Sequence, residues 1–497
     1  MLASAEIVSV PLSAQDGAVG KSKAAGSYYS IDLAVGTPGQ TVPVKFDTGS
    51  SELWVNPECD TSSNPAVCAA QGRFTESTTI DVLEGETGVI GGAQVQYATD
   101  YVRIGSATIT QQIIGLGQSS KDAVVGVFGA GPQSSGFDSA YPTAIDSLAA
   151  QEFIGSRAFS LALKGEGVRV WLTCPGSVIF GGVDTQKYAG QLTKLAVLPG
   201  PNGEAGWFVK LDGISITKVG GAATEVYSGP GQTVLLDTGS SLSTLPPAIF
   251  ASLLEAFPSA KLDDATGLHS VDCSGSVGSI DFSFADKVIS VPVSDFVVNI
   301  PGSDLCVLGA FEGAAASAVL GDTFLKSVYA VFDFDNQAVH LAQAADCGSN
   351  LVAIGSGPAA VPSVEGCAEV ARRSATVEEP ETSPDDDLEW CDEEEEEEDD
   401  EEWCDDEDED EVPTGHPTNT RGNGGHPTGG PGGPRPTGGP GGPHGPITRQ
   451  TLTRTQFSTF TVTSCAPTVT NCHAGGVVTA VITRTTEVCP ESTAVYT

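Results

Sequence analysis

Basic residues are scarce in this chain. Its 497 residues include 23 Lys and Arg against 64 Asp and Glu, which gives a formal net charge of -41. Much of the acidic excess lies between Glu378 and Glu411, a stretch without Lys or Arg. A surface of this sign repels phosphate groups, so we expect no nucleic acid partner. The balance suits a protein that works in acid, where many carboxylates are neutral.

The cysteine spacing of zinc sites is also missing. The chain has 12 cysteines and no C-x-x-C pair, so disulfides are the better interpretation and no metal ion is expected. Disulfides indicate an oxidising compartment, usually outside the cell. No run of about 18 apolar residues is present, so the sequence predicts no membrane-spanning helix.

The N-terminus, MLASAEIVSVPLS, lacks the basic and apolar regions of a signal peptide. This absence conflicts with the cysteine count. We expect that the true start of the chain lies upstream of Met1. The alternatives are unconventional export and reduced cysteines in the cytosol.

Helical patterns are few, and the best cover residues 143–151 and 248–257. From about residue 5 to residue 345, short apolar or alternating runs recur between Gly, Pro, Asn and Asp. Such runs, punctuated by turn residues, are typical of an all-β protein.

The character of the sequence changes near Cys347. Residues 348–375 are small and polar and predict a linker. Residues 376–412 are mostly acidic and 413–447 are rich in Gly and Pro, so neither segment can bury enough apolar surface to offset its ordering entropy. We expect both to be disordered, with the acidic run a solvated tail. Residues 448–497 form a Thr- and Ser-rich tail that contains cysteines.

An internal repeat is the main functional signal. Residues 45–51 read K-F-D-T-G-S-S and residues 235–241 read L-L-D-T-G-S-S, each after an apolar run. A single D-T-G is commonly an Asx turn in which Gly supplies a positive φ. Two copies, with Asp47 and Asp237 placed 190 residues apart, indicate paired carboxylates instead.

Paired carboxylates suit the hydrolysis of a peptide bond without a metal or another cofactor. Two carboxylates about 3 Å apart cannot both ionise, so they share a proton. The ionised group can take a proton from water, and the protonated group can donate to the carbonyl oxygen. We predict these catalytic roles for Asp47 and Asp237, with an optimum in acid. The residues expected to support the two loops are Thr48, Gly49, Ser50, Thr238, Gly239 and Ser240.

Beyond the repeat, the chain resembles the pepsin family of aspartic proteases, of the fungal kind, over roughly residues 5–345. The segments that carry the resemblance are 28–31, 36–40, 53–55, 125–129, 177–184, 318–325 and 331–333. The resemblance implies an all-β, bilobal pepsin-like fold with a central cleft above a six-stranded sheet. It implies a first lobe over 1–200 and a second over 201–347, each with one aspartate, followed by the disordered tail.

The resemblance also implies an aspartic endopeptidase that acts on protein or peptide substrates as a secreted or cell-surface monomer. It pairs Cys59 with Cys68 and Cys273 with Cys306, each pair within one lobe. The Thr-rich end is similar to terminal segments of fungal cell-wall proteins, which implies wall association through the tail. The chain ends without the hydrophobic segment of a GPI signal.

A further disulfide is expected between Cys174 and Cys347. Both cysteines flank strands that we expect in the shared central sheet. The tail cysteines have no assigned partners.

One departure from the family concerns the hairpin that covers the cleft, which usually carries a Tyr. Here that hairpin is expected within residues 79–104, and its tip, interpreted as residues 82–88, has no Tyr. Val82 could take the place of the Tyr, or the hairpin could be rebuilt. Tyr97 lies in the returning strand, and we interpret it as a packed strand residue.

Three functions are consistent with these observations. The two intact D-T-G-S-S loops favour an acid endopeptidase. The missing Tyr favours a catalytically weak or inactive pepsin-fold binding protein of the cell wall. A third function places the main role in the tail of a wall-associated structural protein. No G-x-S-x-G motif supports a serine hydrolase.

Overall fold

The chain divides into two units, Met1–Thr376 and Val377–Thr497, and each is described by itself. The acidic and the Gly/Pro-rich segments expected at 376–412 and 413–447 lie outside the described residues. The computed structural model describes residues 7–18, 25–62, 65–75, 77–90, 92–120, 123–133, 141–163, 176–264, 266–273, 277–299, 305–314, 318–368, 450–461 and 477–488.

One sheet of 13 strands runs through the first unit in the order β12-β25-β24-β9-β10-β1-β2-β3-β8-β4-β7-β6-β5. Its early strands are β1 (Val8–Ala18), β2 (Ala25–Val35), β3 (Gln40–Asp47), β4 (Leu53–Val55), β5 (Asp81–Ile90), β6 (Ala93–Ile104), β7 (Ala107–Ser119) and β8 (Gly126–Gly129). Its later strands are β9 (Ala158–Ala162), β10 (Gly176–Phe180), β12 (Tyr188–Ala196), β24 (Val328–Asp333) and β25 (Ala338–Ala344). The sheet therefore joins strands from both ends of the unit.

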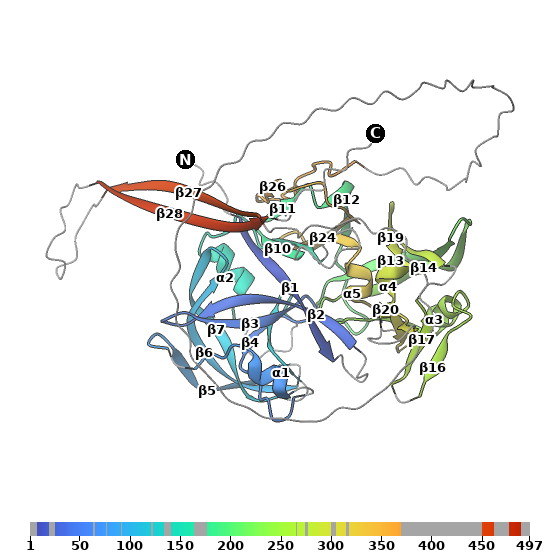
Figure 1. The fold of residues 1–497 in the computed structure, drawn as a ribbon, viewed down its shortest axis with the longest axis horizontal. Helices are drawn as coiled ribbons and strands as arrows, with labels where there is room; N and C mark the ends of the chain where they lie inside the picture. Colours follow the sequence, from blue (N-terminus) through green and yellow to red (C-terminus); the bar gives the residue numbers. More distant parts are fainter. Residues whose placement is uncertain are drawn as a thin grey trace, which may run out of the picture. The chain divides into compact units, whose positions relative to one another are not determined.

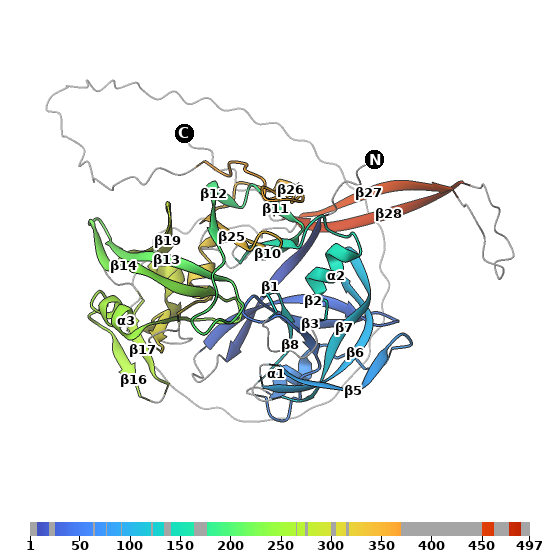
Figure 2. The same ribbon diagram turned by 180° about the vertical axis from the view of Figure 1, so that it is seen from behind.

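A second sheet of seven strands has the order β19-β18-β13-β14-β23-β15-β22. Its strands are β13 (Phe208–Lys218), β14 (Ala223–Leu236), β15 (Ser243–Leu245), β18 (Val277–Phe284), β19 (Lys287–Pro292), β22 (Ala310–Glu312) and β23 (Val319–Leu320). A four-stranded sheet contains β16 (Lys261–Asp263), β17 (Leu268–Asp272), β21 (Leu305–Val307) and β20 (Val298–Asn299). Both lie on the opposite side of β1 from β5, β6 and β7 (Figures 1 and 2).

The helices of the first unit are short. They are α1 (Pro65–Ala70), α2 (Ala144–Ala150), α3 (Pro247–Leu254), α4 (Val293–Phe296) and α5 (Asp322–Leu325). The two best helical patterns of the sequence are confirmed as α2 and α3. A capping box begins α2, in which Thr143 and Asp146 each accept a hydrogen bond from the other's backbone N–H. Within the described residues, no helix has the length and apolar character needed to cross a membrane.

A cluster of aromatic rings fills the core beneath the D-T-G loops. Phe46, the residue before Asp47, stacks on Phe128 with ring centroids 5.6 Å apart. Phe46 also meets Phe159 edge to face, and Phe159 stacks on Phe332 at 4.9 Å. Rings from β3, β9 and β24 thus form one continuous core, which ties both halves of the unit together.

Three disulfides are present in the described residues. Cys59–Cys68 and Cys273–Cys306 match the pairs that the resemblance implies. The third joins Cys347 to Cys367. The expected Cys174–Cys347 pair is therefore wrong, because Cys347 has a partner 20 residues further along the chain. Cys174 itself lies outside the described residues.

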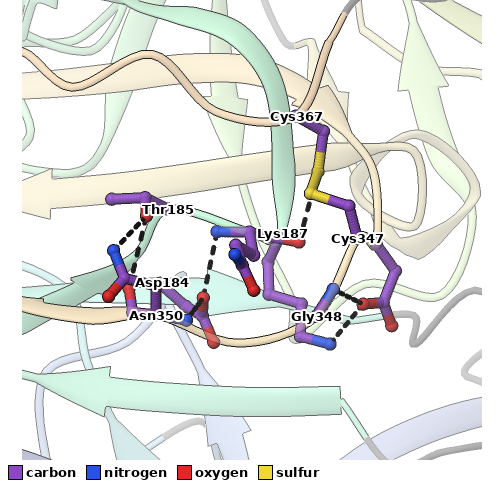
Figure 3. Close-up of a disulfide and its surroundings, with 9 residues drawn as sticks. Asp184, Thr185, Lys187, Cys347, Gly348, Asn350 and Cys367 are labelled. Atoms are coloured by element: carbon purple, nitrogen blue, oxygen red, sulfur yellow. Dashed lines mark hydrogen bonds and ion pairs between the residues drawn. A yellow bond between two sulfur atoms is a disulfide. The ribbon is translucent and has the colours of Figure 1, made fainter. Parts of the chain in front are cut away.

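The segment after Cys347 also differs from the expected linker. Strand β26 (Leu351–Ala353) pairs with β11 (Gly182–Asp184), and Ile354 is buried directly after it. The Asn350 N–H donates to Asp184 Oδ1 at 2.7 Å (Figure 3). Residues 348–368 are therefore a packed part of the first unit. Their few apolar side chains, such as Ile354, are buried beside β11, a contact that is distant in sequence.

Truncation tests this attachment. A chain ending at Ala368 should unfold like the full chain, since it keeps β26 and the Cys347–Cys367 bond. A chain ending at Ser349 loses both, and its free energy of unfolding should fall by about 3 kcal/mol or more. Urea unfolding of the three proteins would measure this. Equal stability of the two truncated chains would show that residues 350–368 contribute nothing to the fold.

A buried histidine in β25 makes a second prediction about stability. Burial lowers the pKa of His340 to about 4; the charge of Lys194 acts in the same direction and that of Asp333 opposes it. The unfolded chain therefore binds more protons than the folded chain between about pH 6.5 and pH 4, so stability falls as the pH drops through this window. His340→Leu should reduce that fall by roughly 2–3 kcal/mol. Urea unfolding at both ends of the window would show it, and an unchanged fall would contradict the assignment.

In the second unit, β27 (Gln450–Thr461) and β28 (Val477–Val488) form an antiparallel pair. Gln450 lies opposite Val488, and Thr461 lies opposite Val477. The Thr-rich tail expected at 448–497 thus contains two paired strands.

Candidate active site

Two strands deliver the aspartates of the repeat to the same place. Strand β3 ends at Asp47, and β14 ends one residue before Asp237. Each strand has a parallel neighbour, β8 beside β3 and β23 beside β14. Phe46 and Leu236 are fully buried, so each strand ends with an apolar anchor directly before its aspartate. The duplication seen in the sequence is thus repeated in the local structure.

Two buried threonines lock the loops together. Thr48 Oγ1 donates to the Leu236 carbonyl at 2.8 Å and accepts from the Thr238 N–H at 3.0 Å. Thr238 Oγ1 donates to the Phe46 carbonyl at 2.8 Å and accepts from the Thr48 N–H at 3.1 Å. The four bonds are related by a local two-fold arrangement, which fixes one loop against the other.

Within each loop the carboxylate is held by the residues that follow it. The Gly49 N–H donates to Asp47 Oδ1 at 2.9 Å, and Ser50 Oγ donates to Asp47 Oδ2 at 2.8 Å. The second loop repeats both contacts. The Gly239 N–H donates to Asp237 Oδ1 at 2.7 Å, and Ser240 Oγ donates to Asp237 Oδ2 at 2.7 Å. Both carboxylates are therefore oriented before any substrate arrives.

The glycines let the two carboxylates approach closely. A Cβ added at Gly49 would overlap Asp237, and one added at Gly239 would overlap Asp47. Each loop therefore leaves room for the carboxylate of the other loop. The negative charge of Asp47 therefore acts directly on Asp237.

Electrostatics favour one proton on this pair. Burial raises the pKa of Asp237, and the negative charge of Asp47 raises it further. The hydrogen bond from Ser240 and the positive charge of Lys45 act in the opposite direction without reversing the shift. A proton is thus retained to a higher pH than on an isolated carboxyl, which provides an acid and a base side by side. Among the described residues, no group of three or more His, Cys, Asp or Glu is placed to hold a metal ion.

A family model, Eukaryotic aspartyl protease, matches residues 28–344. The chain belongs to this family. It is 31% identical over 366 residues to Probable aspartic-type endopeptidase opsB of Aspergillus oryzae, covering 67% of this chain and 72% of the relative. It is 30% identical over 358 residues to Barrierpepsin of Saccharomyces cerevisiae, covering 64% and 60%. As a member of the aspartyl protease family, it is a peptide hydrolase.

The fold agrees with this family. A crystal structure of an aspartic proteinase from Irpex lacteus superposes with a TM-score of 0.54 at 24% sequence identity. The match covers 68% of this chain and 97% of that chain. The predicted all-β, pepsin-like fold is therefore confirmed.

In this aspartyl protease the hairpin of β5 and β6 differs from our expectation. Ile90 pairs with Ala93, so the chain turns between these two residues, and the tip expected at 82–88 is wrong. The expected tip lies inside β5, where the pairing is irregular between Val82 and Thr87. The tight turn needs glycine, since Gly92 has a φ of 88°.

Tyr97 is confirmed as a packed strand residue. It is 7% exposed, and its hydroxyl donates to Glu52 Oε2 at 2.8 Å. The Tyr141 hydroxyl donates to the same oxygen at 2.7 Å. A Cβ at Gly88 would lie 2.5 Å from the Tyr97 hydroxyl, so the glycine leaves room for that ring.

Two charged residues beside the pair were not predicted as site residues. Asp322 begins α5, and its N–H donates to the Ser240 carbonyl at 2.8 Å. Burial raises the pKa of Asp322 well above its usual range, and neither carboxyl oxygen has a hydrogen-bond partner among the described residues. The second residue is Lys45, whose Nζ donates to the Gly239 carbonyl at 2.8 Å. Lys45 lies in the repeat segment 45–51, and Asp322 lies in the segment 318–325 that carries the family resemblance. A charged residue within an apolar run was the signal that could have identified each of them.

Proposed function

We propose that this chain is an aspartic endopeptidase in which Asp47 and Asp237 activate a water molecule for attack on a peptide carbonyl. The observation that carries the proposal is the pair itself: two half-buried carboxylates, held by matching bonds, with a raised pKa on Asp237. Thr48 and Thr238 keep the two loops in register, while Gly49, Ser50, Gly239 and Ser240 orient the carboxylates.

The reaction needs one ionised and one protonated carboxyl. The ionised carboxylate takes a proton from water as the water oxygen bonds to the carbonyl carbon. The protonated carboxyl gives its proton to the carbonyl oxygen, so a neutral tetrahedral diol forms. The carboxyl that took the proton from water then gives it to the amide nitrogen, the other carboxylate takes a proton from a diol hydroxyl, and the C–N bond breaks. A carboxylic acid and an amine leave, and the pair still carries one proton. The two apparent pKa values belong to the pair rather than to either residue.

Digestion of a mixed peptide library from about pH 3 to about pH 7 tests this function. Internal cuts should appear in acid and vanish with a transition-state peptide inhibitor. The alternative is a pepsin-fold binding protein without turnover, which the missing Tyr at the hairpin tip favours. That alternative predicts binding of the same inhibitor with no cleavage at any pH.

We further propose that the protein works as a monomer outside the cell or at its surface, associated with the wall through residues 448–497. The three disulfides support an oxidising compartment. Fractionation of the producing culture into medium, wall and cell contents would test this. Recovery of reduced protein from the cytosol would contradict it.

A further inference from the structure

Lys45 joins the strand of the first D-T-G loop to the backbone of the second loop. It lies in β3 two residues before Asp47, opposite Ser30 of β2 and beside Val127 of β8. Its side chain is half-buried, and Nζ donates to the Gly239 carbonyl at 2.8 Å. The Gly239 N–H in turn donates to Asp237, so the ammonium bonds to the residue that orients the second carboxylate.

Carboxyl groups surround this ammonium from several elements. Asp47 lies on its own strand, Asp237 in the second loop and Asp322 at the start of α5. The charge of Lys45 lowers the pKa of Asp237 and of Asp322, against the larger effect of burial. From β2, Tyr29 lies near Asp322: burial raises the pKa of Tyr29, and the charges of Asp322 and Asp295 raise it further.

A second lysine, Lys326 at the C-cap of α5, provides a contrast. Lys326 lowers the pKa of Asp322 more than Lys45 does. It is not among the groups that act on Asp237, whereas Lys45 is. Of the described cations, Lys45 therefore acts on both the buried carboxyl behind the loop and the pair itself.

A cation in this position should favour the ionised forms of the pair. Opposite charges within about 4–6 Å lower the pKa of a carboxyl, and the effect grows when water is excluded. Without this cation, the cluster of Asp47, Asp237 and Asp322 would hold its protons to a higher pH. The pair would then lack an ionised carboxylate, its base, over more of the acid range.

We propose that Lys45 is a positioning residue for the proposed peptide hydrolysis. Its bond to the Gly239 carbonyl holds the second loop, and its positive charge moves the working pH range of the aspartate pair to lower values. The inference rests on the proposed function, and its test is arranged to separate the two.

The test compares kcat/KM across pH for the wild type, Lys45→Met, Lys45→Arg and Lys326→Met in the full chain. Lys45→Met should move both limbs of the profile upward by about half a pH unit or more, which lowers the rate on the acid limb roughly threefold. Lys45→Arg keeps the charge and should stay near the wild-type profile. Lys326→Met removes an equal charge and should also stay in place. A uniform loss of rate without a shift would overturn the proposal.

Stability against pH gives a second readout that does not need catalysis. A group whose pKa is raised by folding stabilises the fold in acid, and that contribution is lost as the pH rises. Lys45→Met should raise the pKa of Asp237 and Asp322 further, so its stability should fall more steeply from about pH 4 to about pH 7 than that of the wild type. If the wild type cuts no peptide, the proposed function fails, and this steeper fall still decides the role of Lys45. If Lys45→Met does not fold, Lys45→Gln replaces it in both measurements.

Discussion

Asp47→Asn and Asp237→Asn should each abolish peptide cleavage while leaving the fold nearly intact. Asn is close in size to Asp; its amide oxygen can accept from the Gly49 N–H and its amide nitrogen can donate to Ser50 Oγ, with the same exchange possible in the second loop. It cannot act as a base or share a proton with its partner. Initial rates on one peptide, with circular dichroism to confirm folding, would measure the effect. The wild-type profile should be bell-shaped and lie in acid, because one proton must be present on the pair.

Asp264→Asn is a suitable control for this experiment, since Asp264 is exposed. It should retain the wild-type rate. If a folded Asp237→Asn protein kept more than about a tenth of that rate, the barrier would have risen by less than ~1.4 kcal/mol. Such a small loss would rule out the shared-proton mechanism.

Replacing either buried threonine should have the second-largest effect. Thr48→Val keeps the shape of the side chain but removes its hydroxyl, which leaves the Leu236 carbonyl and the Thr238 N–H without a partner. Each unsatisfied buried group costs about 1–3 kcal/mol, so we expect a loss of about 2–5 kcal/mol in unfolding free energy. Activity should also fall, because the loops are no longer held in register.

Thr48→Ser separates the hydroxyl from the methyl group. It restores the donor and acceptor and should recover most of the stability lost in Thr48→Val. Urea unfolding and kcat/KM of both variants would measure this. If Thr48→Ser were as destabilising as Thr48→Val, losing the methyl group would cost as much as losing the hydroxyl, and the hydrogen bonds would not be the main hold on the loops.

The catalytic loops could be predicted because their signal is local and occurs twice. An apolar run followed by D-T-G-S-S specifies a strand, a tight turn and an oriented carboxylate, and the family resemblance adds the fold around them. The predicted position of the hairpin tip was wrong because two glycines in this stretch, Gly85 and Gly92, both have the positive φ that a tight turn requires. Gly85 has a φ of 80° inside β5, and the chain turns between Ile90 and Ala93 instead.

The remaining features depend on neighbours that are distant in sequence. Lys45 reads as one polar residue of a strand until the Gly239 carbonyl is placed 2.8 Å from its ammonium. Asp322 reads as part of a family segment until its burial is known. The wrong partner was predicted for Cys347 because residues 348–368 contain few apolar side chains and were interpreted as a linker. Their pairing with β11, which is distant in sequence, brings them back onto the fold.

The central sheet also determines the order in which the protein can fold during synthesis. Strand β9 pairs with β24, and β12 pairs with β25. Strands β9 and β12 are therefore synthesised before residues 328–344, which contain their pairing partners. Until these emerge from the ribosome, β9 presents an unpaired edge, and Phe159 lacks the Phe332 ring. Unpaired edges and late long-range pairings favour slow folding and association with other chains. The two halves are therefore not separable folding units, and a growing chain needs protection until its last central strands are made.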